Sequence, residues 1–133
     1  MPYDAEDQKI QIMLAYLGYS VGALDGIIGR NTRAAIAHFQ ENYGLEASGE
    51  ADSDTFDALH GAFMEGNYTM SGVVLQLLLH FAGYDPGTID GIVGRNTRAA
   101  IESFQEDMEL EVTGKADDAD TIYALKEQLY AGC

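Results

Sequence analysis

The arginines of this chain all lie in one duplicated segment, where their guanidinium groups could receive an anion. The segment spans residues 25–36 and recurs at residues 90–101, with eleven of its twelve positions identical. Guanidinium groups bind carboxylates and phosphates through paired N–H donors, so the segment is a candidate anion site. The four arginines are Arg30, Arg33, Arg95 and Arg98.

Each arginine pair falls at the start of an expected helix, where a cation is electrostatically unfavourable. A helix N-terminus favours acidic residues, by about 0.3–1 kcal/mol per charge. Helix stability therefore does not explain the arginines, and two explanations stay open. Either an acidic neighbour such as Asp25 or Asp90 pairs with them, or the arginines and the helix amides together receive a carboxylate or another anion.

Residues that could support catalysis are scarce. The three histidines form no His-x-x-x-His pair for zinc, and no Gly-x-Ser-x-Gly nucleophile segment occurs. Cys133, the only cysteine, can form no internal disulfide and is a poor nucleophile candidate without a fixed histidine beside it. The acidic run at residues 117–120 lacks the glycine and the final glutamate of a calcium-binding loop. We expect a non-catalytic protein with no metal and no cofactor.

The overall charge limits the classes of partner. The 133 residues carry a net charge of −15 and are 47% hydrophobic, as in a soluble globular protein. An acidic surface opposes binding to nucleic acid and to anionic membranes. No apolar run approaches the length of a membrane span, and the first residues show no secretory signal. We expect synthesis in the cytoplasm without a visible signal peptide, no nucleic-acid partner and no membrane insertion.

The duplication extends over most of the chain with a period of 65 residues. About half of the positions are identical between residues 8–49 and residues 73–114. Solenoid repeats are usually shorter and need at least three copies, so two small self-contained modules fit better. The prediction is one module over residues 1–66 and a second over residues 67–133.

Apolar residues at spacings of three and four predict three short helices in each module and no strand. In the first module we expect helices over about residues 5–17, over residues 30–43 and from an N-cap at Asp52 onward. In the second module the first helix is expected over about residues 71–82, and one inserted residue precedes the third helix. The fold class is all-α, with two tandem three-helix bundles.

Glycines punctuate the loop between the first two helices of each module. Those at positions 22, 26 and 29 recur at 87, 91 and 94, which suggests a positive φ or a close approach of the backbone. In the helix that follows, Thr32 and Phe39 are expected to face the core. Gly44 ends this helix in the first module, whereas the second has Glu109 at that place. The second turn is therefore expected to be looser, and binding by the second module is less favoured.

The order of these residues resembles a known family. Leu-Gly-Tyr, a glycine loop, Asp-Gly-x-x-Gly-x-x-Thr-x-x-Ala-Ile-x-x-Phe-Gln, Gly-Leu-x-x-x-Gly and x-Thr-x-x-Ala-Leu are similar to the peptidoglycan-binding-domain-like family, over residues 8–59 and 76–125. The resemblance implies three-helix modules that attach to the bacterial cell wall. It also implies a ligand groove formed by the Asp-Gly loop and the helix that follows. The implied ligand-binding residues are Tyr19, Asp25, Arg30, Asn31, Arg33, Gln40, Tyr84, Asp90, Arg95, Asn96, Arg98 and Gln105.

Several residues of this set have a structural alternative. Asp25 could cap the loop or the second helix rather than touch a ligand. Tyr19 could pack back on the end of the first helix or stack on a sugar ring. The resemblance alone does not decide between these roles.

Three functions are compatible with a non-catalytic tandem of such modules. We favour a subunit that binds peptidoglycan or a surface polysaccharide and anchors a larger assembly, such as the capsid or spike of a phage-like particle. One alternative is a cytoplasmic protein-interaction module that has lost glycan binding. The other is a standalone cell-wall-targeting accessory of a separate wall hydrolase. The expected location is a particle surface, or the exterior after cell lysis.

Overall fold

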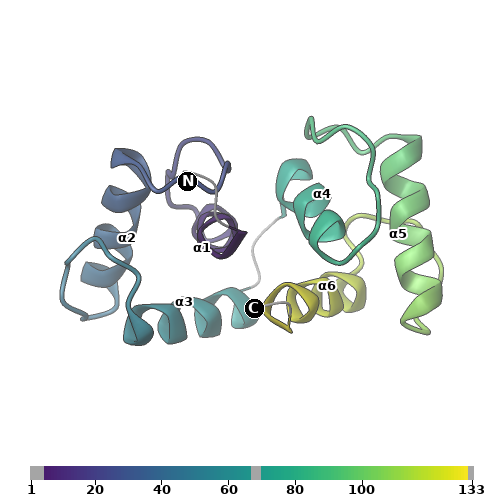
Figure 1. Ribbon diagram of the computed structural model, residues 1–133. Coiled ribbons are helices and arrows are strands. Elements are labelled where there is room, and N and C mark those ends of the chain that lie inside the picture. The colour runs from purple at the N-terminus through teal and green to yellow at the C-terminus, as the bar shows by residue number, and fades with distance from the viewer. Residues whose placement is uncertain (1–4, 67–69, 132–133) are drawn as a thin grey trace. The chain divides into compact units, whose positions relative to one another are not determined.

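The computed structural model describes residues 5–66 and 70–131, and these residues form six helices (Figure 1). Loops and turns connect the helices, and the described residues contain no strand. The all-α fold class predicted from the sequence is confirmed. The helices are α1 (Ala5–Tyr16), α2 (Arg30–Asn42), α3 (Ser53–Glu65), α4 (Gly72–Phe81), α5 (Arg95–Asp107) and α6 (Ala119–Ala131).

Contacts divide the chain into two compact units, Met1–Tyr68 and Thr69–Cys133, which we call the first and second units. The predicted boundary between residues 66 and 67 falls beside residues 67–69, which lie outside the described part of the chain. In the first unit α1 packs against both α2 and α3, and in the second unit α4 packs against both α5 and α6. In Figure 1, α1 is seen almost along its axis whereas α3 lies across the view, so the two cross steeply. The first helix is thus the centre of each bundle.

The core of each unit consists of apolar side chains at helical spacing. In the first unit, Phe39 of α2 and Phe63 of α3 are fully buried. In the second unit the corresponding places are taken by Phe104 of α5 and Leu129 of α6, which are also buried. Removing this apolar surface from water is the main favourable contribution to folding. No buried side-chain nitrogen or oxygen among the described residues lacks a hydrogen-bond partner.

The helices begin in two different ways. Asp52 accepts the N–H of Thr55 at 2.9 Å and caps α3 as predicted, and Ser71 caps α4 in the same manner. In contrast, α2 and α5 follow Gly29 and Gly94, which provide no side-chain cap. The expectation of a positive φ or a close approach at these two glycines is wrong, because φ is −104° and −101° and an added Cβ would meet nothing within 4 Å.

The turn after α5 has the same form as the turn after α2. In both turns a leucine N–H donates to a carbonyl oxygen five residues earlier at 2.8 Å. The residue before that leucine is Gly44 in the first unit, with φ of 71°, and Glu109 in the second, with φ of 59°. The expectation of a looser second turn is therefore wrong. Glu109 adopts the left-handed conformation that glycine adopts more easily.

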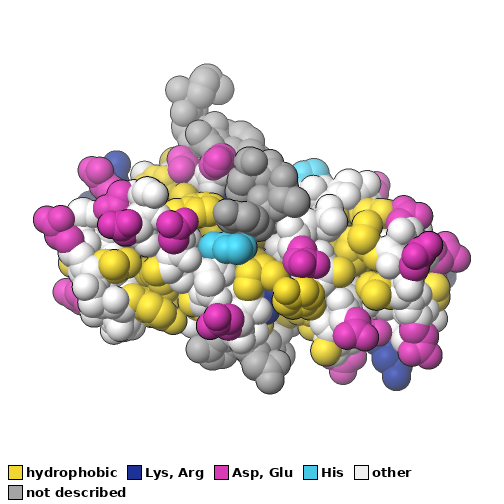
Figure 2. All heavy atoms as spheres, turned by 90° about the horizontal axis from the view of Figure 1, so that it is seen from below, with side chains coloured by type: hydrophobic (Ala, Val, Ile, Leu, Met, Phe, Trp, Pro, Cys, Tyr) yellow, Lys and Arg dark blue, Asp and Glu magenta, His cyan; other side chains and the backbone are white. Residues whose placement is uncertain are grey.

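Acidic side chains are spread over the surface of both units. On the face shown in Figure 2 they far outnumber lysine and arginine. None of the described helices is long and apolar enough to cross a membrane. On a chain with a net charge of −15, an exposed guanidinium is a local exception that can distinguish one place on the surface from the rest.

Candidate ligand-binding site

A hollow of about 410 Å³ opens beside the start of α2, lined by the loop after α1 and by the first turn of α2. We call it the Arg30 hollow. The matching segment of the second unit lines a hollow of about 360 Å³, the Arg95 hollow. Three of the predicted site residues meet at each one. They are Asp25, Arg30 and Asn31 in the first unit, and Asp90, Arg95 and Asn96 in the second.

The loop around the Arg30 hollow is held from the inside by Gln11 of α1, which is fully buried. Its Nε2 donates to the hydroxyl of Thr32 at 3.1 Å and to the carbonyl oxygen of Ile27 at 3.0 Å. Its Oε1 accepts the N–H of Gly26 at 2.7 Å. One side chain thus joins the central helix, the loop and the first turn of α2. The walls of the hollow are therefore set by buried hydrogen bonds.

Asp25 belongs to the same network. Its Oδ1 accepts the N–H of Ile27 at 2.9 Å and the Nε2 of Gln11 at a longer 3.4 Å. The carboxylate therefore shapes the loop, and it does not cap α2, because its hydrogen-bond donors are Ile27 and Gln11 and not the N–H groups at the start of the helix. Of the roles considered from the sequence, loop capping is the one that the geometry shows.

The second unit repeats this arrangement around Gln76 of α4. The Nε2 of Gln76 donates to the hydroxyl of Thr97 and to the carbonyl oxygen of Ile92, both at 3.0 Å, and its Oε1 accepts the N–H of Gly91 at 2.9 Å. The N–H of Ile92, and then the side chain of Gln76, hold the pKa of Asp90 below its ordinary value of 3.8. Asp90 is therefore ionised at neutral pH.

The guanidinium groups are exposed and carry no internal partner. Within residues 5–66 and 70–131, none of them forms an ion pair or a side-chain hydrogen bond. Pairing with Asp25 or Asp90 is not found, because those carboxylates accept hydrogen bonds from backbone and glutamine N–H groups. Of the two explanations for the arginines, availability to a ligand agrees with the structure. The exposed arginines are Arg30, Arg33, Arg95 and Arg98.

The start of α2 adds backbone donors beside Arg30. The first N–H within the helix that reaches a helical carbonyl belongs to Arg33, which donates to Gly29 at 3.0 Å. The N–H groups before it have no capping side chain. They and the helix dipole favour a negative charge at this end. Since α5 begins in the same way after Gly94, each unit combines a free guanidinium with open amides.

Arg33 does not share a hollow with Arg30. It lines a separate hollow of about 220 Å³ bounded by α1, α2 and the turn before α3, which we call the Arg33 hollow. Its counterpart Arg98 is exposed on α5 and does not line the Arg95 hollow. The single groove that the resemblance implied is thus divided, and only the first arginine of each segment faces the loop.

Gln40 and Gln105, which the resemblance places in the ligand set, are fully buried. The Nε2 of Gln40 donates to the hydroxyl of Thr55 at 2.9 Å, and its Oε1 accepts the N–H of Gly49 at 2.9 Å. Gln105 makes the corresponding bond to Thr121 at 2.9 Å. This part of the expectation is corrected, because both amides are used inside the fold. They fasten the turn between the second and third helices of each unit.

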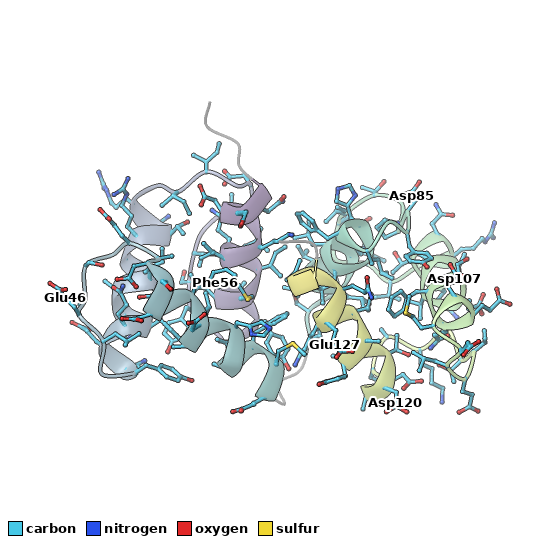
Figure 3. All side chains as sticks on the ribbon, turned by 60° about the horizontal axis from the view of Figure 1, so that its bottom comes forward. Glu46, Phe56, Asp85, Asp107, Asp120 and Glu127 are labelled. Carbon is cyan, nitrogen blue, oxygen red and sulfur yellow. The ribbon has the colours of Figure 1, made fainter. Side chains whose placement is uncertain are left out.

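Tyr19 and Tyr84 lie at the opposite end of the second helix from the hollows. The hydroxyl of Tyr19 accepts the Nδ2 of Asn42 at 2.9 Å, and the hydroxyl of Tyr84 donates to Oδ2 of Asp107 at 2.5 Å. Figure 3 shows Asp107 on α5. Neither tyrosine lines a hollow, so neither is placed to stack on a ligand there. Both join the end of one helix to the end of the next.

The glutamines that position both loops were not among the residues predicted from the sequence. Gln76 is the only polar residue in the apolar run 73–79, and Gln11 stands 65 positions before it, so a signal was present. Ile27 and Ile92 were not predicted either; they are 43% and 68% exposed and add an apolar edge to the hollows. A polar residue that recurs within an apolar helix face is therefore a marker for a loop anchor.

The described residues offer no metal centre and no aromatic platform at the hollows. No group of histidine, cysteine, aspartate or glutamate in the described ranges could hold a metal ion. Cys133 lies outside those ranges. In the acidic run before α6, Asp118 accepts the N–H of Asp120 at 3.1 Å and so shapes the start of the helix. The chemistry left for the Arg30 and Arg95 hollows is recognition of charge and of small apolar groups.

Comparison with known proteins identifies the family of the chain. The family model described as "Putative peptidoglycan binding domain" matches residues 4–59 and 73–125. The chain is 48% identical over 58 residues to the "Putative OxPP cycle protein OpcA" of Synechococcus elongatus. The matched residues make up 44% of the chain and 13% of that protein. It is 34% identical over 85 residues to the spore cortex-lytic enzyme of Oceanobacillus iheyensis, which covers 60% of the chain and 30% of that enzyme. The matched part is thus less than a third of either relative, and no solved structure matches the chain.

Proposed function

The chain belongs to the family of peptidoglycan binding domains, and we propose that it binds peptidoglycan without catalysis through the Arg30 and Arg95 hollows. In this proposal Asp25 and Asp90 orient the loops, and the residues beside them contact the polymer. The contacting residues are Ile27, Arg30 and Asn31 in the first unit, and Ile92, Arg95 and Asn96 in the second.

The observation that carries the proposal is the pairing of an exposed guanidinium with an uncapped helix start at both hollows. Both features favour an anion, on a surface that is otherwise acidic. The peptide part of peptidoglycan carries carboxylates next to small apolar side chains. Because no aromatic ring lines either hollow, contact with these peptide groups fits better than stacking on sugar rings.

The role that we propose within the cell is attachment of a larger assembly to the wall. The matched segment is a small part of both relatives, which supports a binding module that accompanies other components. One relative is named for lysis of the spore cortex, and this supports a second candidate, a targeting accessory of a wall hydrolase. Attachment of a phage-like particle, and a location on its surface or outside the cell after lysis, stay predictions.

The proposal is tested by co-sedimentation of the protein with purified sacculi and with capsule polysaccharide. Wild type should pellet with sacculi. The double variant Arg30→Gln/Arg95→Gln should bind sacculi with an affinity at least about tenfold lower than that of wild type, because a charge-assisted hydrogen bond contributes about 1.5–3 kcal/mol. The matched control Arg98→Gln/Lys115→Gln removes the same charge from residues outside both hollows and should bind like wild type.

Two outcomes would contradict the proposal. Wild type that stays in the supernatant with both polymers would exclude wall binding and favour the protein-interaction alternative. Equal weakening by the control variant would show that binding depends on total charge and not on the hollows. A difference between single and double variants would also show whether both units contribute, since two weak sites on one polymer bind with avidity only if both can engage.

A further inference from the structure

The Arg33 hollow brings the guanidinium of Arg33 and the carboxylate of Glu50 to one small depression of the first unit. Arg33 of α2 and Glu50 of the turn before α3 both line this hollow of about 220 Å³. Both side chains are exposed, and within the described ranges neither forms an ion pair with the other or with a third residue. A guanidinium and a carboxylate therefore face the same space without neutralising each other.

The turn that carries Glu50 is held firmly against α2. The buried Nε2 of Gln40 donates to the carbonyl oxygen of Glu50 at 2.9 Å, and its Oε1 accepts the N–H of Gly49 at 2.9 Å. A Cβ built on Gly49 would lie 3.5 Å from the backbone oxygen of Arg33, so the turn lies directly beside α2. The backbone positions of the two charged residues are thus set by the fold before any ligand arrives.

Asp7 of α1 also lines the hollow, and this residue is not without a partner of its own. The apolar walls come from Ile10 of α1, Ile28 of the loop and Ile36 of α2. An occupant that suits these surroundings has an ammonium for the carboxylate, a carboxylate for the guanidinium and a short hydrocarbon chain for the isoleucines. An α-amino acid carries its ammonium, its carboxylate and its side chain on one carbon atom.

We propose that the Arg33 hollow binds a free α-amino acid as its zwitterion. Arg33 receives the carboxylate and Glu50 receives the ammonium. The site is distinct from the Arg30 hollow and does not depend on the function proposed for it.

The second unit differs at the corresponding place, which restricts the proposed site to the first unit. The counterpart of Arg33 is Arg98, but that of Glu50 is Lys115, and that of Asp7 is Gly72. Two cations replace the opposite charges of the first unit. An ammonium would be repelled there, so the second unit is an internal control within the same chain.

The test is a titration of the ¹⁵N-labelled full chain, followed by amide chemical shifts in NMR. The probe is 2,6-diaminopimelic acid, which has an α-amino acid group at each end. Pimelic acid has the same carbon chain and carboxylates without ammonium groups, and 1,5-diaminopentane supplies ammonium groups alone. We expect shifts of Ile28, Ile36 and Ala51 with the probe, and much smaller shifts with either control compound.

Variants assign the two charges. Arg33→Gln and Glu50→Gln should each weaken binding of the probe about tenfold or more, whereas Arg98→Gln and Lys115→Gln should leave it unchanged. The amide spectrum of each variant shows that its fold is retained. Equal shifts with pimelic acid, shifts confined to the Arg30 hollow, or no shift at about 20 mM probe would each overturn the proposal.

Discussion

The side-chain amide of Gln11 donates to the hydroxyl of Thr32 at 3.1 Å, and this bond ties the central helix of the first unit to the first turn of α2. Thr32 in turn donates to the carbonyl oxygen of Val21 at 3.2 Å. The second unit repeats the pair as Gln76 and Thr97, joined at 3.0 Å. The proposed contact residues are therefore positioned by a buried amide that does not itself face the hollow.

Replacing Gln11 by leucine should destabilise the chain strongly. Leucine has a similar volume, but it would leave the buried N–H of Gly26 and the carbonyl oxygen of Ile27 without their partner, and each unsatisfied group costs about 1–3 kcal/mol. We expect the free energy of unfolding to fall by about 2–4 kcal/mol in urea denaturation. Gln128→Leu on α6 is the matched control and should change it by less than about 0.5 kcal/mol. Equal losses in the two variants would contradict the anchoring role.

Glu109→Gly should stabilise the second unit. A left-handed conformation costs a non-glycine residue about 1–2 kcal/mol, and glycine at position 109 would remove this cost. Part of the gain in stability is offset by the greater freedom of glycine in the unfolded chain. We expect a net gain of about 0.5–1 kcal/mol, measured by thermal or urea unfolding. The opposite test is Gly44→Ala at the equivalent position of the first unit, which should lower the free energy of unfolding by a similar amount. A loss of stability in Glu109→Gly would show that the glutamate side chain makes a contribution that outweighs its backbone strain.

The hydroxyl of Tyr84 should make the stability of the second unit depend on pH above about pH 10. Its hydrogen bond to Asp107, followed by burial and by the charge of Asp107, raises the pKa of Tyr84 above its ordinary value of 10.0. The folded state thus favours the protonated phenol. The contribution is complete below about pH 10 and is lost as the pH rises through the higher folded pKa.

Tyr84→Phe removes this contribution and tests it. The variant should be less stable than wild type at neutral pH, and the difference should shrink above pH 10, as followed by unfolding at several pH values. Tyr19→Phe is the control, because the partner of Tyr19 is the neutral side chain of Asn42. A difference for Tyr84→Phe that stays constant with pH would contradict the assignment.

The helices could be predicted because the spacing of their apolar residues is a local property. Thr32 and Phe39 lie on the buried face as expected, with 2% and 0% of their surfaces exposed, and Asp52 caps α3. The same reasoning failed at Gly29, where the third glycine of the loop is an extended N-cap and not a positive-φ residue. A glycine pattern indicates that the backbone is unusual, but it does not identify which conformation each position adopts.

The site could be predicted only in part. The placement of Arg30 against the helix dipole identified a residue that the fold leaves open. Gln40 was assigned to the ligand because the resemblance includes it, and it lies about two helical turns after Arg33 on the same flank of α2. The turn before α3 folds over Gln40 and leaves Arg33 exposed, and this coverage depends on a contact between distant segments. Helical position alone cannot show which part of a flank a later turn will cover.

Gly72 shows how closely α4 approaches the loop of the Arg95 hollow. A Cβ added at Gly72 would lie 2.1 Å from the carbonyl oxygen of Gly91, so Gly72→Ala must displace backbone. We expect a loss of about 1–3 kcal/mol in the free energy of unfolding, with amide shifts in NMR centred on Asp90 and Gly91. Gly61→Ala in α3 is the matched control, since its Cβ would meet nothing within 4 Å and alanine should stabilise the helix by about 0.5–1 kcal/mol. If Gly72→Ala proves neutral, the close packing of α4 on this loop is not required for the hollow to form.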